Sequence, residues 1–86
     1  MICTLTRTKT EPGVVGEKIT LIMECEGARE ELHITALKGH MRFSEDGDAK
    51  CIATTDNFWS DFARLPGVSA RLISHDETSA RYEVLD

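Results

Sequence analysis

Hydrophobic and polar residues alternate along most of this chain. The clearest alternation lies between residues 18 and 26, where one set of positions holds Ile19, Leu21, Met23 and Cys25 and the other holds Thr20, Ile22, Glu24 and Glu26. A period of two places the two sets on opposite faces of an extended chain. The pattern therefore predicts a β-strand with one buried and one exposed face.

Similar patterns, rich in β-branched residues, predict six further strands. They cover residues 2–8, 31–37, 50–54, 68–75 and 79–85, together with a strand that starts at residue 41. Gly27 and Gly39 separate neighbouring strands, and the segment Glu45-Asp46-Gly47-Asp48 is typical of a hairpin turn, because Gly accepts positive φ without steric cost. Most connections are too short for a helical crossover, which favours antiparallel pairing.

One segment, residues 54–67 (TTDNFWSDFARLPG), departs from the alternation and predicts a helix over about residues 56–65. Thr55 or Asp56 can cap its start by accepting a hydrogen bond from a free amide. Pro66-Gly67 ends it, since a proline disfavours helical geometry in the residue before it. The apolar stripe that docks on the sheet consists of Phe58, Phe62 and Leu65, and the residues expected to point away are Asn57, Asp61 and Arg64.

Trp59 lies at the flank of this stripe, about 100° around the helix from Phe58. We favour a place in the core, because large aromatic side chains are mostly buried. If the ring is instead exposed, it is the best anchor for a partner protein, since interfaces are enriched in Trp.

Five strands, one helix and two more strands define the expected fold. We predict an α+β protein: a small antiparallel sheet or partial barrel of about seven short strands with one helix packed on it. A chain of 86 residues supports one small core, so residues 1–86 are expected to form a single domain.

Patterns that carry chemistry are missing from the sequence. It has no GxSxG, P-loop or GxGxxG motif and no CxxC pair, and six residues separate His33 from His40, which is wider than the usual zinc spacing. Cys25 is expected to face inward and to be inert. We therefore expect no catalytic residues, no metal and no cofactor; a cysteine-based site is the one enzymatic alternative.

The cysteines and the N-terminal segment bear on location. Cys3, Cys25 and Cys51 are an odd and sparse set, whereas small secreted domains carry a denser, even set. The first residues contain no long apolar stretch, so neither a signal peptide nor a membrane span is expected. These features predict a cytoplasmic protein with reduced cysteines.

Charge limits the class of partner. The formal net charge is −5; residues 1–43 are neutral, and the whole excess lies in residues 44–86. Negative charge repels nucleic-acid phosphates and speeds the encounter with basic surfaces.

Nucleic-acid binding is nevertheless an alternative, through Arg7, Lys9, Arg42 and Lys50, of which Arg42 and Lys50 are expected to lie opposite each other. Leu5-Thr6-Arg7 and Gly16-Glu17, with the strands that follow them, resemble the start of the carbon-storage-regulator family of RNA-binding proteins. The resemblance implies five strands followed by a helix. The family's later Ala-Pro and basic RNA-contacting segment have no counterpart here, so no family is assigned.

Acidic residues carry the leading hypothesis. We predict a small non-enzymatic binding or inhibitor protein that occupies a basic surface, possibly a nucleic-acid-binding one, on a larger protein, as phage-encoded inhibitors such as anti-CRISPR proteins do. The residues expected to contact that partner are Glu24, Glu26, Glu30, Glu31, Glu45, Asp46, Asp48 and Trp59. Carboxylates on a rigid scaffold can complement a Lys/Arg groove or imitate the phosphates of a duplex, and the imitation becomes attractive only if several acidic clusters share one face. A second alternative is a structural protein that assembles through an exposed strand edge.

Overall fold

The computed structural model describes residues 1–14, 16–45, 48–55 and 57–85. The elements follow one another as β1 (Ile2–Pro12), β2 (Glu17–Cys25), β3 (Ala28–Leu37), β4 (His40–Glu45), β5 (Asp48–Ala53), α1 (Phe58–Arg64), β6 (Ala70–His75) and β7 (Ser79–Val84). This order of five strands, one helix and two strands is the predicted order.

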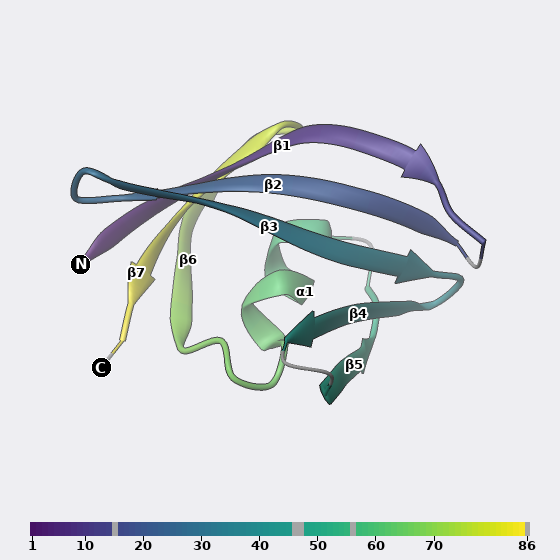
Figure 1. Ribbon diagram of the computed structural model, residues 1–86. Coiled ribbons are helices and arrows are strands. Elements are labelled where there is room, and N and C mark those ends of the chain that lie inside the picture. The colour runs from purple at the N-terminus through teal and green to yellow at the C-terminus, as the bar shows by residue number, and fades with distance from the viewer. Residues whose placement is uncertain (15, 46–47, 56, 86) are drawn as a thin grey trace.

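The strands form one sheet in the order β5-β4-β3-β2-β1-β7-β6, and all neighbouring pairs are antiparallel. The first five strands form a meander, and the β6–β7 hairpin returns so that β7 pairs with the first strand. Figure 1 shows the sheet curled around α1, which lies on its concave face. The sheet is thus an open half-barrel with one short helix, and the α+β prediction holds in this form.

The helix and the central strands differ in length. Seven helical residues span about 10 Å, whereas the eleven residues of β1 would span about 34 Å if the strand were straight. One short helix therefore covers only part of the concave face. Toward the end where β3 leads into β4, the curled β4 and β5 lie close to α1 (Figure 1).

The core lies between the concave face and α1. The strand alternation places Leu5, Ile19, Leu21, Ile34, Met41, Ala80 and Tyr82 there, and the helix and its end contribute Trp59, Phe62 and Leu65. The alternation predicted for residues 18–26 is confirmed, since Ile19 and Leu21 are buried while Lys18 and Glu24 are exposed.

The helix begins later than predicted and is capped by another residue. Asn57 is the N-cap, and its side-chain oxygen accepts hydrogen bonds from the amides of Trp59 and Ser60 at 3.0 and 3.2 Å. Thr55 does not cap the helix; it donates to Asp61 instead. Asp56, the other predicted cap, lies outside the described residues.

The helix is also rotated relative to the predicted stripe. Trp59 is 3% exposed and Asp61 1% exposed, whereas Phe58 is only half-buried. The prediction that Asp61 points away is wrong. Packing against the sheet buries the face that carries Trp59, Phe62 and Leu65, and Asp61 next to it is tolerated because it accepts hydrogen bonds there.

The pairing of β1 with β2 joins two cysteines. Cys3 lies opposite Cys25 with 4.4 Å between their Cα atoms, a separation typical of a non-hydrogen-bonded antiparallel pair, and their sulfurs form a disulfide. The expectation of reduced cysteines is wrong for this pair, because strand register brings together residues that are 22 positions apart.

Within the described ranges, no helix is long and apolar enough to cross a membrane.

Candidate functional site

The β2–β3 hairpin carries four of the carboxylates that the sequence singled out. Residues 24–31 contain four glutamates and one arginine, for a formal charge of −3. The turn is tight: Glu26 adopts φ 44° and Gly27 φ 86°. The four glutamates, Glu24, Glu26, Glu30 and Glu31, are all exposed.

Strand register distributes these glutamates over both faces. Glu30 pairs with Met23, whose side chain packs against the core, so Glu30 belongs to the concave side. Glu31 pairs with Ile22, and both it and Glu24 belong to the convex side. The carboxylates therefore surround the end of one hairpin rather than covering a single face.

The carboxylates of this hairpin are mostly unpaired. Glu31 lies 4.0 Å from the His33 ring, and both side chains are exposed. None of the ion pairs within the part of the chain that the structure describes involves Glu24, Glu26 or Glu30. Three of the four charges are thus available to an external cation.

Exposed apolar side chains lie at the same end of the sheet. Figure 1 places the N-terminus beside the β2–β3 turn, and the C-terminus follows on the other side of β1. The amide of Val84 donates to the carbonyl of Met1 at 2.8 Å, which holds the two ends together. Met1 is 54% exposed, Ile2 40% and Leu85 48%. Acidic and apolar groups thus meet at this end of the molecule.

Trp59 does not contribute to that surface. Its ring is buried, and its Nε1 donates to the carbonyl of Asp76 at 2.9 Å. The core placement favoured from the sequence is confirmed. The alternative role as an exposed anchor is wrong, because the sheet curls over the ring.

The second acidic group lies at the β4–β5 hairpin, where the structure describes the backbone of Glu45 and Asp48 but not their side chains. Glu45 pairs with Asp48 at the end of the hairpin. Asp46 lies outside the described residues, as do the side chains of Glu45 and Asp48. Their contact with a partner stays a prediction.

The basic residues proposed for nucleic-acid binding do not form one surface. Arg7 shares the concave face of β1 with Leu5, and its guanidinium lies 5.4 Å from the centre of the Phe58 ring and donates to the carbonyl of Glu77 at 2.8 Å. The bulge that follows sends Lys9 to the opposite face. Arg42 pairs with Cys51, and Lys50 pairs with Phe43. The expected opposition of Arg42 and Lys50 is therefore wrong by one residue.

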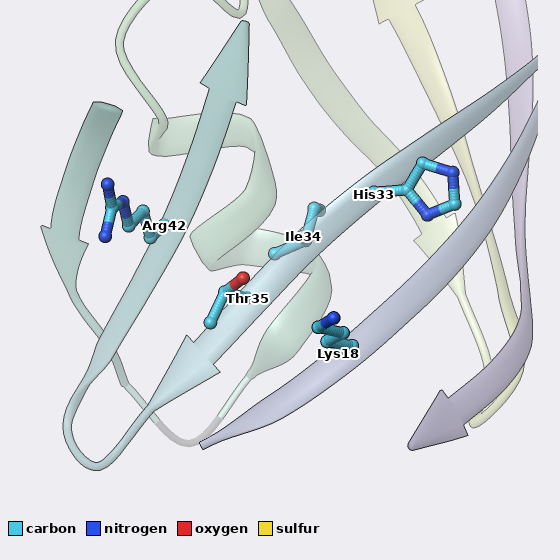
Figure 2. Close-up of a pocket in the computed structure, with 5 residues that line it drawn as sticks. All are labelled: Lys18, His33, Ile34, Thr35 and Arg42. Atoms are coloured by element: carbon cyan, nitrogen blue, oxygen red, sulfur yellow. The ribbon is translucent and has the colours of Figure 1, made fainter. Parts of the chain in front are cut away.

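A different basic hollow lies on the convex face (Figure 2). Lys18 pairs with Thr35, and Thr35 pairs with Arg42, so these three residues form a row across β2, β3 and β4. Together with His33 they line a shallow hollow of about 320 Å³. Glu11 pairs with Lys18 on the other side and forms a 2.6 Å ion pair with Lys9, which reduces the positive charge of this region.

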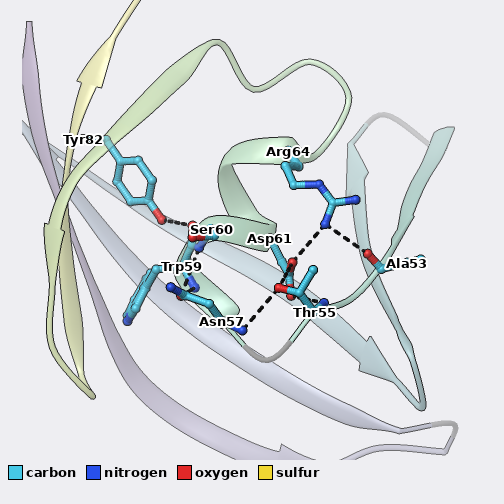
Figure 3. Close-up of polar contacts among 8 residues, drawn as sticks. All are labelled: Ala53, Thr55, Asn57, Trp59, Ser60, Asp61, Arg64 and Tyr82. Atoms are coloured by element: carbon cyan, nitrogen blue, oxygen red, sulfur yellow. Dashed lines mark hydrogen bonds and ion pairs between the residues drawn. The ribbon is translucent and has the colours of Figure 1, made fainter.

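A polar network fixes α1 in place (Figure 3). The Asp61 carboxylate accepts hydrogen bonds from the amide and hydroxyl of Thr55 at 2.9 and 2.8 Å and pairs with Arg64 at 3.1 Å. The Tyr82 hydroxyl donates to the Trp59 carbonyl, and burial raises the pKa of Tyr82. These hydrogen bonds connect α1 to the segment before it and to β7.

The described residues contain no group of three or more His, Cys, Asp or Glu side chains that could hold a metal ion. Comparisons with protein families, curated proteins and solved structures find no match for this chain. The physical properties of the surfaces therefore carry the functional argument.

Proposed function

We propose that this chain is a small non-enzymatic binding protein that docks the β2–β3 end of its sheet against a basic surface of a larger protein. Glu24, Glu26, Glu30 and Glu31 attract the partner. The exposed side chains of Met1, Ile2 and Leu85 replace Trp59 as the apolar contact. Occupying such a surface blocks it, so the protein acts as an inhibitor of its partner.

The observation that carries this proposal is the combination of unpaired carboxylates and exposed apolar groups at one end of the molecule. Charge complementarity speeds encounter and selects partners, whereas apolar contacts supply much of the affinity at the centre of an interface. An exposed apolar side chain alone needs no explanation. Its position beside three unpaired carboxylates is what supports docking here.

Two further parts of the proposal rest on the sequence. Glu45, Asp46 and Asp48 extend the acidic contact. The cytoplasmic location is inferred from the sparse cysteines alone, and the Cys3–Cys25 disulfide argues against it, because disulfides are rare in the cytosol.

Charge reversal at the hairpin tests the proposal. The protein carrying Glu24→Lys and Glu26→Lys is compared with the native protein for capture of a partner from the source lysate, and then for affinity toward the purified partner. We expect the reversal to weaken binding at least tenfold, and native binding to weaken as salt is raised.

A matched control reverses exposed glutamates elsewhere on the molecule. Glu17→Lys and Glu77→Lys lie at the opposite end of β2 and in the β6–β7 turn. Binding of this control is expected to stay near the native value. Equal loss in both variants would mean that net charge, and not the β2–β3 end, governs binding. A size that grows with concentration in gel filtration would favour self-assembly through a strand edge.

A further inference from the structure

A pocket opens on the concave face, at the β2–β3 end that the short helix leaves uncovered. Its volume is about 260 Å³. Its floor consists of buried core side chains, among them Leu5, Phe62 and Tyr82, and its walls include the half-buried Met23 and Leu32. The pocket exists because β2 and β3 continue past the seven-residue helix, so the helix covers their inward-facing apolar side chains only in part.

One charged residue marks the rim. Among the described residues that line the pocket, Glu30 is the charged one, and it lies on β3 next to the exposed hairpin turn. The opposite rim is the segment from Gly67 to Ser69, which leads from α1 into β6. An apolar pocket with one carboxylate at its mouth can bind an apolar side chain that has a positively charged side chain next to it.

The volume limits the size of that group. Typical small-molecule sites begin at roughly 300 Å³. An engineered apolar cavity of roughly 150 Å³ holds a benzene molecule. A space of about 260 Å³ therefore has room for one aromatic or branched aliphatic side chain and is small for a cofactor.

We infer that this pocket receives one large apolar side chain from a basic segment of the partner protein, while a neighbouring Lys or Arg of that segment pairs with Glu30. The inference rests on the proposed function, because the basic segment belongs to the surface that the hairpin carboxylates attract. Glu30 points to the concave side while Glu24 and Glu31 lie on the convex side, so Glu30 alone links the acidic hairpin to the pocket.

Two synthetic peptides test the inference. One has phenylalanine at its centre and arginine or lysine at four flanking positions; the other has serine at its centre. Binding is followed by NMR through the methyl signals of Met23, Leu32 and Val68, which line the pocket. We expect the phenylalanine peptide to shift these signals saturably. The serine peptide should bind at least about tenfold more weakly, because it lacks the transfer free energy of a buried aromatic side chain.

Adjacent residues of β3 supply a matched pair of variants. Glu30→Gln and Glu31→Gln remove the same charge one residue apart, on opposite faces, and both side chains are exposed, so both variants are expected to fold. Glu30→Gln should weaken the phenylalanine peptide two- to fivefold, a loss typical of one exposed ion pair. Glu31→Gln should affect both peptides equally, through charge alone.

The outcomes separate the two proposals. If both peptides bind the hairpin with equal affinity and leave the methyl signals unshifted, the pocket inference is overturned while the proposed function stands. If neither peptide binds at low salt, attraction to a basic segment is itself refuted, and both proposals fail. Shifts at Met23, Leu32 and Val68 that depend on phenylalanine and on Glu30 support the inference.

Discussion

Single residues decide how α1 is held, and the clearest case is Asp61. It is the one charged side chain that the structure shows buried in the described ranges, and each of its oxygens has a partner. A buried carboxylate is tolerated only when hydrogen bonds replace its lost hydration. Asp61 thus connects the segment before the helix to the helix itself.

Replacing Asp61 by Ala should lower the free energy of unfolding by about 2–4 kcal/mol, because the Thr55 amide loses its acceptor in a part-buried position. Urea unfolding checks this, with the slope m expected to stay unchanged. Arg64→Ala is the control: its side chain is half exposed, so the loss should stay within about 1 kcal/mol. Equal losses in the two variants would contradict the structural role of Thr55.

Asp76 predicts a dependence of stability on pH. Its carboxylate accepts hydrogen bonds from the amides of Thr78 and Ser79. These bonds lower the pKa of Asp76 below its ordinary value, and the bond from Thr78 has the larger effect. A lowered pKa in the folded state means that the stabilisation is complete above about pH 4, the unfolded value, and is lost as pH falls through the folded pKa.

The variant Asp76→Asn keeps the shape of the side chain and removes its titration. The native protein should exceed this variant in stability at pH 7, and the difference should shrink toward zero as the pH falls below about 4. Urea midpoints measured from pH 7 to pH 2 check it. A difference for Asp76→Asn that stays constant from pH 7 to pH 2 would refute the prediction.

The register between paired strands decides which residues of neighbouring elements meet, and the sequence alone does not specify it. The β1–β2 hairpin brings Cys3 to Cys25, and the bulge between Arg7 and Lys9 sends neighbouring basic residues to opposite faces. The lengths of the elements also matter, since a seven-residue helix leaves one end of the long strands uncovered. The candidate pocket is a direct consequence of that mismatch.

The disulfide is expected to stabilise the β1–β2 hairpin. In the chain-entropy account, closing a loop of this length contributes on the order of 3 kcal/mol, so adding a reductant should lower the urea midpoint. Alkylation of the denatured protein should modify one thiol before reduction and three after it, as counted by mass spectrometry. The variant Cys51→Ser should keep the response to reductant. Three reactive thiols before reduction would show that the bond does not form in solution.

For the whole molecule, charge is arranged by region. The β2–β3 end carries unpaired carboxylates, while the convex face carries the hollow of Lys18, Thr35 and Arg42 with Glu11 beside it. Both signs are present, so the net charge of −5 does not describe what each surface attracts. The basic hollow is the place where the nucleic-acid alternative can be tested.

A gel-shift assay with generic RNA and DNA at low salt should show no retarded band. Lys18 and Arg42 are too few cations to offset the repulsion between an acidic protein and phosphates, since nucleic-acid affinity depends on neutralising many of them. Retarded bands that disappear with Lys18→Glu and Arg42→Glu would instead favour a nucleic-acid-binding regulator. Retarded bands unaffected by these changes would exclude the convex hollow as the site.

Much of the fold could be predicted because its signals are local. Alternation with a period of two marks the strands, and glycines at positive φ mark the turns at Gly27 and Gly39. The order of elements and the antiparallel pairing followed from short connections. The acidic hairpin could be predicted for the same reason, since Glu24, Glu26, Glu30 and Glu31 lie within one tight turn and its flanking strands.

Long-range packing decided the rest. Which side of α1 faces the sheet is set by how Trp59 and Phe62 fit the curled strands, and that rotation buried Asp61 and left Phe58 only half-buried. The joining of Cys3 to Cys25 depends on the register between β1 and β2, and the uncovered pocket depends on the mismatch between the short helix and the long strands. A periodic pattern specifies which residues share a face of one strand, but the contacts between strands come from the free energy of packing the whole sheet.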